Sequence, residues 1–429
     1  MYFPMRVLLS QVRIADPHQH ALSAPCDILI VNGYIDQIAD HIEDETAERI
    51  ALPNAHVSPG WVDLFADFGD PGFERKEDLI SGCAAAAAGG FTEVCLVPNT
   101  SPVVQSKAEL DYLLHKSKDQ AVTIRPLGAI SKDLEGKSLA ELYDLHAHGA
   151  VAFSDGWQPV QSAGLLLKAL EYVRAFNGII IQLPDDRSLS AYGLMHEGIH
   201  SVRLGMPGIP AISELIPVQR DVELTRYTAS RLHFTGISTR DALEVIAAAK
   251  QQGVQVSCSV TPYHLALTDA CLENYDACLK VIPPLRAEED VKALKQAIEQ
   301  GIIDAFATHH RPQDVESKQV EFEYAAPGMI GLESFFGIIN RELPAVSLLQ
   351  KITMLTTKPR TLLGLSDIQI SVGKEANLTI FDPDQEWIFE EKHIRSKSHH
   401  SPFIGQRLKG FVYGIVAKHQ LILPHVSPQ

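Results

Sequence analysis

The sequence predicts an α/β protein: a TIM-like (β/α)8 barrel with a small β-sandwich domain formed by both termini. Short apolar runs alternate with helix-length amphipathic segments across residues 58–364. This alternation is typical of parallel β/α architecture, and its length favours a barrel over an open sheet. Strand-like segments separated by turns occupy residues 1–57 and 365–429. We therefore expect a barrel at 58–364, with residues 1–57 and 365–429 as the two parts of the β domain.

The N-terminal part contains a predicted strand and a predicted hairpin. The apolar stretch within residues 1–15 is too short and too alternating for a signal peptide, so we expect a strand. Residues 26–31 and 34–38 flank Asn32-Gly33, and Asn-Gly between alternating apolar segments is a strong hairpin signal. Because residues 376–381 and 410–416 are also strand-like, we expect the two ends of the chain to pair.

Strands and helices are expected in alternation along the barrel. The expected strands are 93–97, 150–153, 179–181, 254–258 and 305–308, and the expected helices are 79–88, 165–176, 239–251 and 288–299. In a barrel of this kind the functional residues lie at the carboxyl ends of the strands.

Composition excludes several classes of protein. The 429 residues include 37 Lys and Arg against 53 Asp and Glu, a net charge of −16, which argues against binding nucleic acid through its phosphates. No apolar run approaches the roughly 20 residues that span a bilayer. The six cysteines form no C-x-x-C pair, and Cys95 and Cys258 lie in apolar runs. These features predict reduced core thiols in a cytoplasmic protein that binds neither nucleic acid nor membrane.

Short motifs follow one another along the whole chain. They are Gly90-Phe91-Thr92, Pro98-Asn99-Thr100, Phe153-Ser154-Asp155, His196-Glu197-Gly198, Ile237-Ser238-Thr239, Val260-Thr261-Pro262-Tyr263-His264-Leu265, Pro283-Pro284-Leu285-Arg286 and Gly331-Leu332-Glu333. In this order they resemble the dihydroorotases of the amidohydrolase superfamily. The resemblance implies a barrel of the metal-dependent hydrolase type, a split β domain and a place in pyrimidine biosynthesis.

The resemblance also implies where a metal site would lie. In that family two divalent metals, usually zinc, activate a bridging water, and His and carboxylate side chains hold them. The corresponding positions here are Phe65, Asp67, Asp155, Gln182, Gly236 and His309. Phenylalanine and glycine offer no ligand, and a glutamine amide is a poor substitute for imidazole. We therefore expect no catalytic residues and no metal cofactor; if a metal binds, Asp67, Asp155 and His309 are its candidate ligands.

The substrate-binding positions implied by the resemblance are altered as well. Gly69 stands where an arginine grips the substrate carboxylate, Ile282 replaces an asparagine and Gln313 replaces a histidine. Loss of the guanidinium removes the strongest recognition available for a carboxylate. Asn99 is retained and is a possible substrate contact, although Pro98-Asn99-Thr100 is equally typical of a turn.

Other polar residues have simpler interpretations. His146 and His148 lie at an expected helix end, and His399-His400 lies in a polar segment, so we expect structural or surface roles. Glu74, Lys76, Glu77 and Asp78 are expected to cap and solvate the helix that begins near Leu79. For Asp67 and Asp155 we favour neutralisation by His309 or Arg311 over a stray cation.

Together these features favour a dihydroorotase-like protein without dihydroorotase activity. Families of this type include non-catalytic homologues that associate with aspartate transcarbamoylase and support its assembly. The resemblance thus implies the aspartate transcarbamoylase catalytic subunit as a partner, in a homo- or hetero-oligomer. Two alternatives stay open: a divergent amidohydrolase with a reduced single-metal site, and a sensor that binds a metabolite without turnover.

Overall fold

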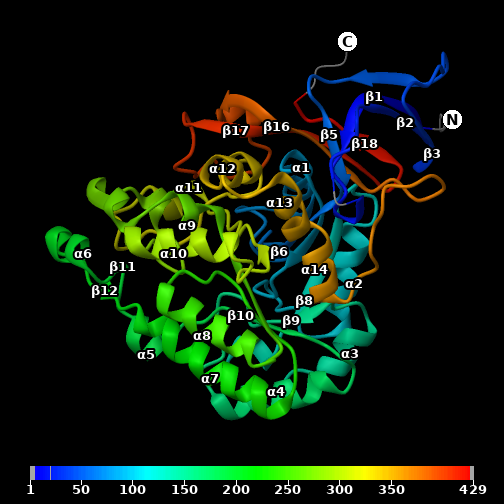
Figure 1. Ribbon diagram of the computed structural model, residues 1–429. Helices are drawn as coiled ribbons and strands as arrows, with labels where there is room; N and C mark the ends of the chain where they lie inside the picture. The colour runs from blue at the N-terminus through cyan, green and yellow to red at the C-terminus, as the bar shows by residue number, and fades with distance from the viewer. Residues whose placement is uncertain (1–4, 20, 426–429) are drawn as a thin grey trace.

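A (β/α)8 barrel forms the body of the protein in the computed structural model, which describes residues 5–19 and 21–425 (Figure 1). The barrel strands are parallel and lie in the order β15-β14-β13-β10-β9-β8-β7-β6. Their bounds are β6 Trp61–Ala66, β7 Phe91–Leu96, β8 Thr123–Gly128, β9 Ala152–Phe153, β10 Ile180–Gln182, β13 Leu232–Phe234, β14 Val256–Val260 and β15 Ala305–Phe306. A parallel bridge between Ala66 and His310 brings β6 beside the end of β15. The predicted barrel is confirmed.

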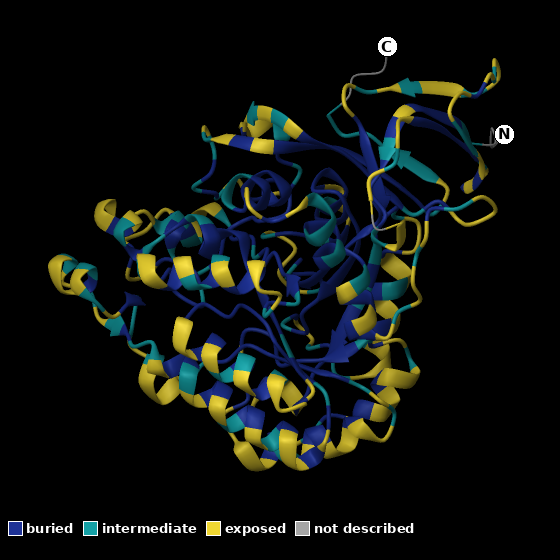
Figure 2. Ribbon diagram, viewed as in Figure 1, coloured by how far each residue is buried: buried dark blue, intermediate teal, exposed yellow. Residues whose placement is uncertain are grey.

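Amphipathic helices surround these strands. They are α1 Leu79–Ala88, α2 Lys107–Lys116, α3 Leu142–Ala147, α4 Ala163–Arg174, α7 Ile212–Thr228, α8 Arg240–Gln251, α10 Glu288–Glu299, α13 Leu348–Leu355 and α14 Thr357–Leu363. In α8, Thr239 caps the N-terminus, and Leu243, Ile246 and Ala249 are buried at helical spacing. Figure 2 shows the result: the strands at the centre are buried and the outward helix faces are exposed.

Short elements decorate the loops. They are β11 Met195–His196, β12 Gly208–Ile209, α5 Arg187–Ser190, α6 Ile199–Leu204, α9 Pro262–Ala266, α11 Val315–Lys318 and α12 Phe335–Glu342, with 3-10 turns at Pro17–Gln19, Lys132–Leu134, Asp269–Asn274, Ala277–Leu279 and Glu391–His393. The pair β11–β12 carries α6 away from the barrel body (Figure 1).

Both ends of the chain build one further sheet, in the order β18-β17-β16-β5-β1-β2-β3, with β4 paired to β1. Its strands are β1 Arg6–Ile14, β2 Cys26–Val31, β3 Tyr34–Ala39, β4 Glu48–Ala51, β5 His56–Pro59, β16 Leu378–Ile388, β17 Arg407–Ala417 and β18 Gln420–Ile422. The hairpin is confirmed: Val31 pairs with Tyr34 across Asn32 and Gly33, both at positive φ. Residues 1–4 of the expected first strand lie outside the described residues.

The two parts of this sheet share one hydrophobic core. Leu9 and Ile28 from the N-terminal part pack in the same cluster as Leu378, Ile380 and Val416 from the C-terminal part. The expected β domain made by both termini is therefore confirmed, whereas the boundaries at residues 57 and 364 stay a prediction. Burial of apolar side chains from both parts holds together segments that are far apart in the sequence.

The fold bears on two features expected from the composition, namely membrane spans and buried cysteines. Within the described residues, no helix combines the length and the apolar character needed to cross a membrane. Cys95 and Cys258 are buried free thiols, as expected, and burial raises the pKa of Cys258 to about 12. Neither thiol is therefore a thiolate nucleophile at neutral pH.

Candidate functional site

An aromatic cluster of Phe65, Trp157 and His309 fills the centre of the barrel mouth. Phe65 lies at the end of β6, Trp157 follows β9 and His309 follows β15, so the carboxyl ends of three strands supply them. The Phe65 ring centroid lies 4.7 Å from that of His309 and 5.0 Å from that of Trp157. Trp157 and His309 meet edge to face at 5.4 Å. All three side chains are buried, so ring packing occupies the place where the resemblance implies a metal site.

His309 and Gly236 occupy one space in this mouth. The Nε2 atom of His309 lies 2.8 Å from the hydroxyl of Thr235. A Cβ atom at Gly236 would lie 2.4 Å from Cε1 of His309, so only glycine leaves room for the ring. Burial holds the pKa of His309 well below its ordinary value. His309 is therefore a neutral packed ring at neutral pH, and the expectation that it neutralises a carboxylate as a cation is wrong.

Asp155 points into the wall of the barrel. Its Oδ1 accepts from the backbone N–H groups of Ile130 (2.8 Å) and Ser131 (2.9 Å), and its Oδ2 accepts from the Ser131 hydroxyl (2.5 Å). Burial raises the pKa of Asp155 to about 6, although these hydrogen bonds favour the ionised form. The side chain thus fixes the turn after β8.

Asp67 is held by uncharged donors. The indole Nε1–H of Trp157 donates to its Oδ2 (3.0 Å), and the backbone N–H of Gly69 donates to its Oδ1 (2.9 Å). The Arg311 guanidinium lies over the indole of Trp157, 4.4 Å from its centroid. Among the described residues, neither Asp67 nor Asp155 lies within 4.0 Å of a side-chain nitrogen of His309 or Arg311. A direct ion pair, as favoured from the sequence, is therefore not formed, although burial lowers the pKa of Arg311 and the charge of Asp67, across the cavity that both residues line, partly offsets this lowering.

The side chains of Asn99 and Gln182 also form hydrogen bonds with backbone groups. Asn99 donates to the carbonyl of Asp155 (3.2 Å) and accepts from the N–H of Trp157 (3.0 Å), which anchors the loop that carries the indole. Gln182 donates to the carbonyl of Val160 (3.3 Å). The turn-holding interpretation of Asn99 thus has structural support, and its contact with a substrate stays a prediction.

The residues of this mouth do not fit the metals implied by the resemblance. No three His, Cys, Asp or Glu side chains in the described ranges are grouped so that they could hold a metal ion. Asp155 uses both oxygens in the wall, His309 is turned to Thr235, and Phe65 has no donor atom. The suggested ligand set of Asp67, Asp155 and His309 is therefore not brought together.

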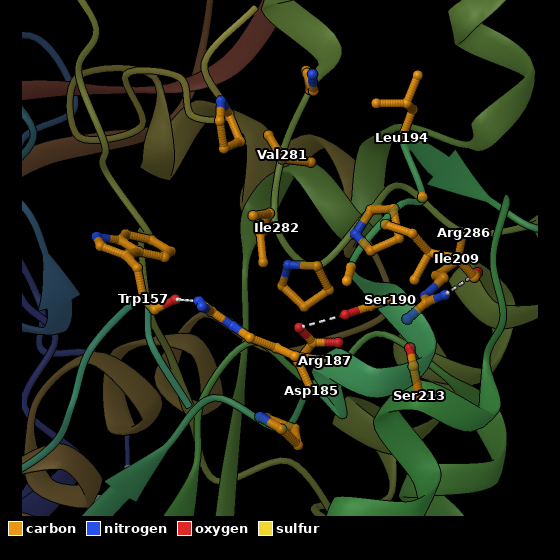
Figure 3. Close-up of a pocket in the computed structure, with 17 residues that line it drawn as sticks. Trp157, Asp185, Arg187, Ser190, Leu194, Ile209, Ser213, Val281, Ile282 and Arg286 are labelled. Atoms are coloured by element: carbon orange, nitrogen blue, oxygen red, sulfur yellow. Dashed lines mark hydrogen bonds between the residues drawn. The ribbon is translucent and has the colours of Figure 1, made fainter. Parts of the chain in front are cut away.

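Two adjoining cavities remain around the aromatic cluster. The first, of about 370 Å³, is lined by Asp67, Gly69, Asn99, Ile282, Gln313, Lys76, Arg187 and Arg311. The second, of about 290 Å³, is more apolar and is lined by Leu194, Ile209, Val281, Pro283 and Arg286 (Figure 3). Trp157, Arg187 and Ile282 line both. Gly69, Ile282 and Gln313, where the resemblance implies substrate contacts, thus line one cavity together with three cations.

The sequence did not indicate that these three cations lie together. Arg187 donates to the carbonyl of Trp157 (2.9 Å), as Figure 3 shows, and Lys76 comes from the loop before α1. No spacing relates Lys76, Arg187 and Arg311, because each follows a different strand. Only Arg311, two residues after His309, lies close to a position that the resemblance singles out.

The segment before α1 is only partly as expected. Asp78 caps the helix by accepting from the N–H groups of Ile80 and Ser81, both at 2.9 Å, which confirms the capping role. Glu77, in contrast, is fully buried and accepts from the Ser81 hydroxyl and the Lys397 backbone N–H. The expectation of a solvated side chain at Glu77 is therefore wrong.

A buried ion pair joins several of the sequence motifs. Arg286 donates from Nε to the Ser238 hydroxyl (2.9 Å) and lies 3.5 Å from Glu214. Glu214 accepts from the backbone N–H groups of Ser238 (3.0 Å) and Thr239 (2.9 Å). His196 lies beside Arg286, and burial together with this positive charge lowers its pKa to about 4. The motifs therefore meet in a structural network, and Glu214 was not anticipated.

The isolated histidine pairs lie away from the mouth cavities. His146 lies near the end of α3 and stacks on Phe176 at 4.5 Å, and His148 caps the same helix through its contact with the Asp144 carbonyl. His399 is exposed and His400 is half-buried in the loop before β17. Structural or surface positions are what the sequence predicted for them.

Comparison with known proteins agrees with this architecture. A family model described as dihydro-orotase-like matches residues 55–242, and an amidohydrolase family model matches residues 222–416. A dihydroorotase from Syntrophotalea carbinolica is 40% identical over 95% of this chain and 96% of its own. A dihydroorotase from Pelotomaculum thermopropionicum is 37% identical over 98% and 99%.

Solved structures resemble the fold. An L-hydantoinase (dihydropyrimidinase) from Arthrobacter aurescens superposes with a TM-score of 0.83 at 24% identity, covering 97% of this chain and 96% of its own. A dihydropyrimidinase from Brevibacillus agri gives the same TM-score at 20% identity, covering 98% and 95%. At these identities the likeness concerns the fold alone.

Proposed function

Because the chain belongs to the dihydroorotase family of amidohydrolases, we propose that it is a non-catalytic member of that family in pyrimidine biosynthesis. The observation that carries the proposal is the aromatic cluster of Phe65, Trp157 and His309. Attack of water on a cyclic amide needs a metal-bound hydroxide or a base that can take a proton. The imidazole of His309 is bonded to Thr235 and is a weak base, because burial holds its pKa well below the ordinary value, and the carboxylates of the mouth are engaged with other donors.

Activity and metal content test this proposal directly. The purified chain and the Syntrophotalea carbinolica relative are assayed side by side for dihydroorotate hydrolysis and for ring closure of carbamoyl aspartate. Both are measured with added zinc or manganese and after treatment with a chelator. We expect turnover only from the relative, and no stoichiometric metal in this chain. Chelator-sensitive turnover by this chain contradicts the proposal.

We further propose that the chain acts in the cytoplasm as a structural or regulatory partner of the aspartate transcarbamoylase catalytic subunit. The identity of the partner rests on the sequence resemblance. The net charge of −16 supports association with a cationic partner surface, because complementary charge steers such encounters. A mixed oligomer of the two chains is the assembly we expect.

Native purification tests the partnership. The chain is isolated from its own cell with mass identification of bound proteins, and the catalytic subunit is then assayed with and without it. We expect a complex of defined stoichiometry and a transcarbamoylase activity that depends on the chain. A catalytic subunit that assembles and works equally well alone contradicts the partnership and leaves the first proposal standing.

One observation favours a second candidate, a sensor that binds an acidic metabolite without turnover. The 370 Å³ cavity at the mouth is lined by three cations, Lys76, Arg187 and Arg311, against two carboxylates, Asp67 and Glu77. Calorimetry with dihydroorotate, orotate and carbamoyl aspartate tests this candidate, with Arg311→Met as the variant expected to lose binding. A single-metal hydrolase has no comparable support, because its three candidate ligands do not converge among the described residues.

A further inference from the structure

A separate cavity lies where the barrel meets the terminal sheet. It has a volume of about 550 Å³ and lies between α12 and α13 on one side and β16 and β17 on the other. Figure 1 shows α12 beneath β16 and β17. The charged and amide residues of the cavity lining are Asn340, Arg341, Lys351, Arg407 and Lys409 together with the carboxylates Asp384 and Glu386, and the lining shares no residue with the two cavities at the mouth. A volume of this size accommodates a small metabolite.

Lys351 places a poorly compensated ammonium group in the lining of this cavity. Only 3% of the residue is exposed. Its Nζ donates to Oδ1 of Asn340 (2.7 Å), and no carboxylate of the described residues lies within 4.0 Å of it. An ammonium has three N–H donors, so two of them lack an acceptor in the described part of the chain. Burial lowers the pKa of Lys351 to about 8, which leaves the group mainly charged at pH 7.

The other cations of the cavity already have carboxylate partners. Arg407 pairs with Glu386 at 3.0 Å and Lys409 pairs with Asp384 at 3.4 Å. Arg341 pairs with Glu342 at 2.8 Å and shares this carboxylate with Lys295, which lies 2.8 Å from its other oxygen. Within the described residues, Lys351 is thus the cation of this lining that has no carboxylate within 4.0 Å. A positive excess here is not a consequence of composition, because the whole chain carries a net charge of −16.

The first turn of α13 adds a further feature. Ser347, Leu348 and Lys351 all line the cavity, so the N-terminus of this helix faces it. The first N–H groups of a helix have no intrahelical acceptor and carry partial positive charge; in α13 the Ser347 hydroxyl accepts from the N–H of Gln350 (3.2 Å), and the two N–H groups before it belong to Leu348 and Leu349. Helix N–H groups combined with lysine and arginine donors are typical of phosphate binding.

An isolated buried ammonium lowers the stability of a folded protein, and an apolar side chain of similar length would avoid that cost. We propose that the cavity binds an oxyanion of the phosphate class, free or as part of a small metabolite, with Lys351 as its central donor. The proposal requires neither the absence of catalysis nor the association with aspartate transcarbamoylase. The bound oxyanion would contact both the barrel and the terminal sheet and so link the two at their junction.

Calorimetric titration at constant ionic strength tests the proposal, with inorganic phosphate and ribose 5-phosphate as probes. Loss of a charge-assisted hydrogen bond is expected to weaken binding about tenfold or more in Lys351→Met. Lys292→Met removes the same charge from an exposed position on α10 and should leave the affinity unchanged. The probe that binds more tightly to the wild type distinguishes a free phosphate from a phosphorylated metabolite.

A stability measurement separates ligand binding from a structural role. We expect inorganic phosphate to raise the melting temperature of the wild type but not that of Lys351→Met, whereas a purely structural lysine would leave the phosphate-induced shift the same in both proteins. If this variant does not fold, Lys409→Gln at the exposed rim decides the question, with binding expected to be about threefold weaker. Three results overturn the proposal: no binding of either probe to the wild type, unchanged affinity in Lys351→Met, or unchanged affinity in Lys409→Gln when Lys351→Met does not fold.

Discussion

At the scale of single residues, the packing of His309 against Gly236 determines how the barrel mouth is filled. Gly236 has φ +68°, a conformation that side chains other than glycine rarely adopt, and the His309 ring lies against its Cα. The two altered positions are thus neighbours in space although they lie far apart in the sequence. A histidine introduced at position 236 would clash with the ring of His309, since even a Cβ there would lie 2.4 Å from Cε1 of that ring.

Replacement of Gly236 by alanine tests this packing. Gly253 is a matched control, because it has φ +78° and no atom lies within 4 Å of the position that a Cβ would take there. We expect Gly253→Ala to lower the free energy of unfolding by about 1 kcal/mol through backbone strain. Gly236→Ala should cost about 1–3 kcal/mol more through overpacking against His309. Urea denaturation measures both, and equal losses would contradict the packing.

His233 predicts a dependence of stability on pH. It is buried in β13, with Nδ1 2.8 Å from the Ser257 hydroxyl and Nε2 3.0 Å from the Ser259 hydroxyl. Burial lowers its pKa to about 3. The unfolded chain takes up a proton near pH 6.5 and the folded chain does not, so acidification favours unfolding. The stability linked to His233 is complete above about pH 6.5 and is lost as the pH falls towards about 3.

Denaturation curves at several pH values measure this linkage. Between about pH 6 and pH 5, each such histidine should remove about 1.4 kcal/mol of stability per pH unit. In His233→Gln we expect the slope of stability against pH to fall by about this amount. The same slope in the wild type and in the variant would show that His233 is protonated in the folded protein.

At the scale of elements, Asp155 shows how an acidic residue at a strand end can serve the wall of the barrel. The carboxylate follows β9, yet it closes the turn after the neighbouring strand β8 through Ile130 and Ser131. The sequence places an acid after a strand end, and only the side-chain direction shows that it serves the wall. The turn after β8 is therefore held by a side chain of the next loop.

Substitution at Asp155 therefore changes stability. Asp155→Ala leaves buried N–H donors without an acceptor, and we expect a loss of about 2–4 kcal/mol. Asp155→Asn keeps a carbonyl oxygen for the two backbone donors and should lose less. Unfolding in urea gives the free energies, and hydrogen exchange at the Ile130 and Ser131 amides reports on the turn. Unchanged exchange in Asp155→Ala would contradict this role.

Local sequence predicted many element boundaries. Helices α1 and α10 begin and end at the residues expected, because Asp78 caps the first and an amphipathic pattern defines the second. The strand expected at 305–308 is shorter, since β15 ends at Phe306. There the backbone N–H and hydroxyl of Thr308 donate to Asp63 on β6. That contact joins residues far apart in the sequence, so no local sequence pattern predicts it.

At the scale of the whole molecule, aromatic packing joins the barrel to the terminal sheet. Trp61 begins the first barrel strand, and its ring lies 5.4 Å from Phe381 on β16 and 5.0 Å from Phe336 on α12. Its Nε1–H donates to the Ser58 hydroxyl on β5 (2.9 Å). We infer that the two parts unfold together.

Phe381→Ala tests this coupling. Removal of a fully buried phenylalanine typically costs about 3–5 kcal/mol, and here the cost falls on both parts. Tryptophan fluorescence reports on Trp61 and Trp157 in the barrel and on Trp387 in the terminal sheet, and far-UV circular dichroism reports on the helices. We expect one transition, shifted equally by both probes. Separate transitions would show that the sheet unfolds independently.

The sequence by itself determined the order of strands and helices, the hairpin, and the presence at positions 65 and 236 of a phenylalanine and a glycine, whose side chains have no metal-ligand atom. These follow from local periodicity and from residue type, which hold in any conformation. Only the tertiary structure decided that Asp155 faces the wall and that Lys76 and Arg311 share a cavity. Side-chain direction and proximity between distant loops depend on packing of the whole chain, which no short segment specifies.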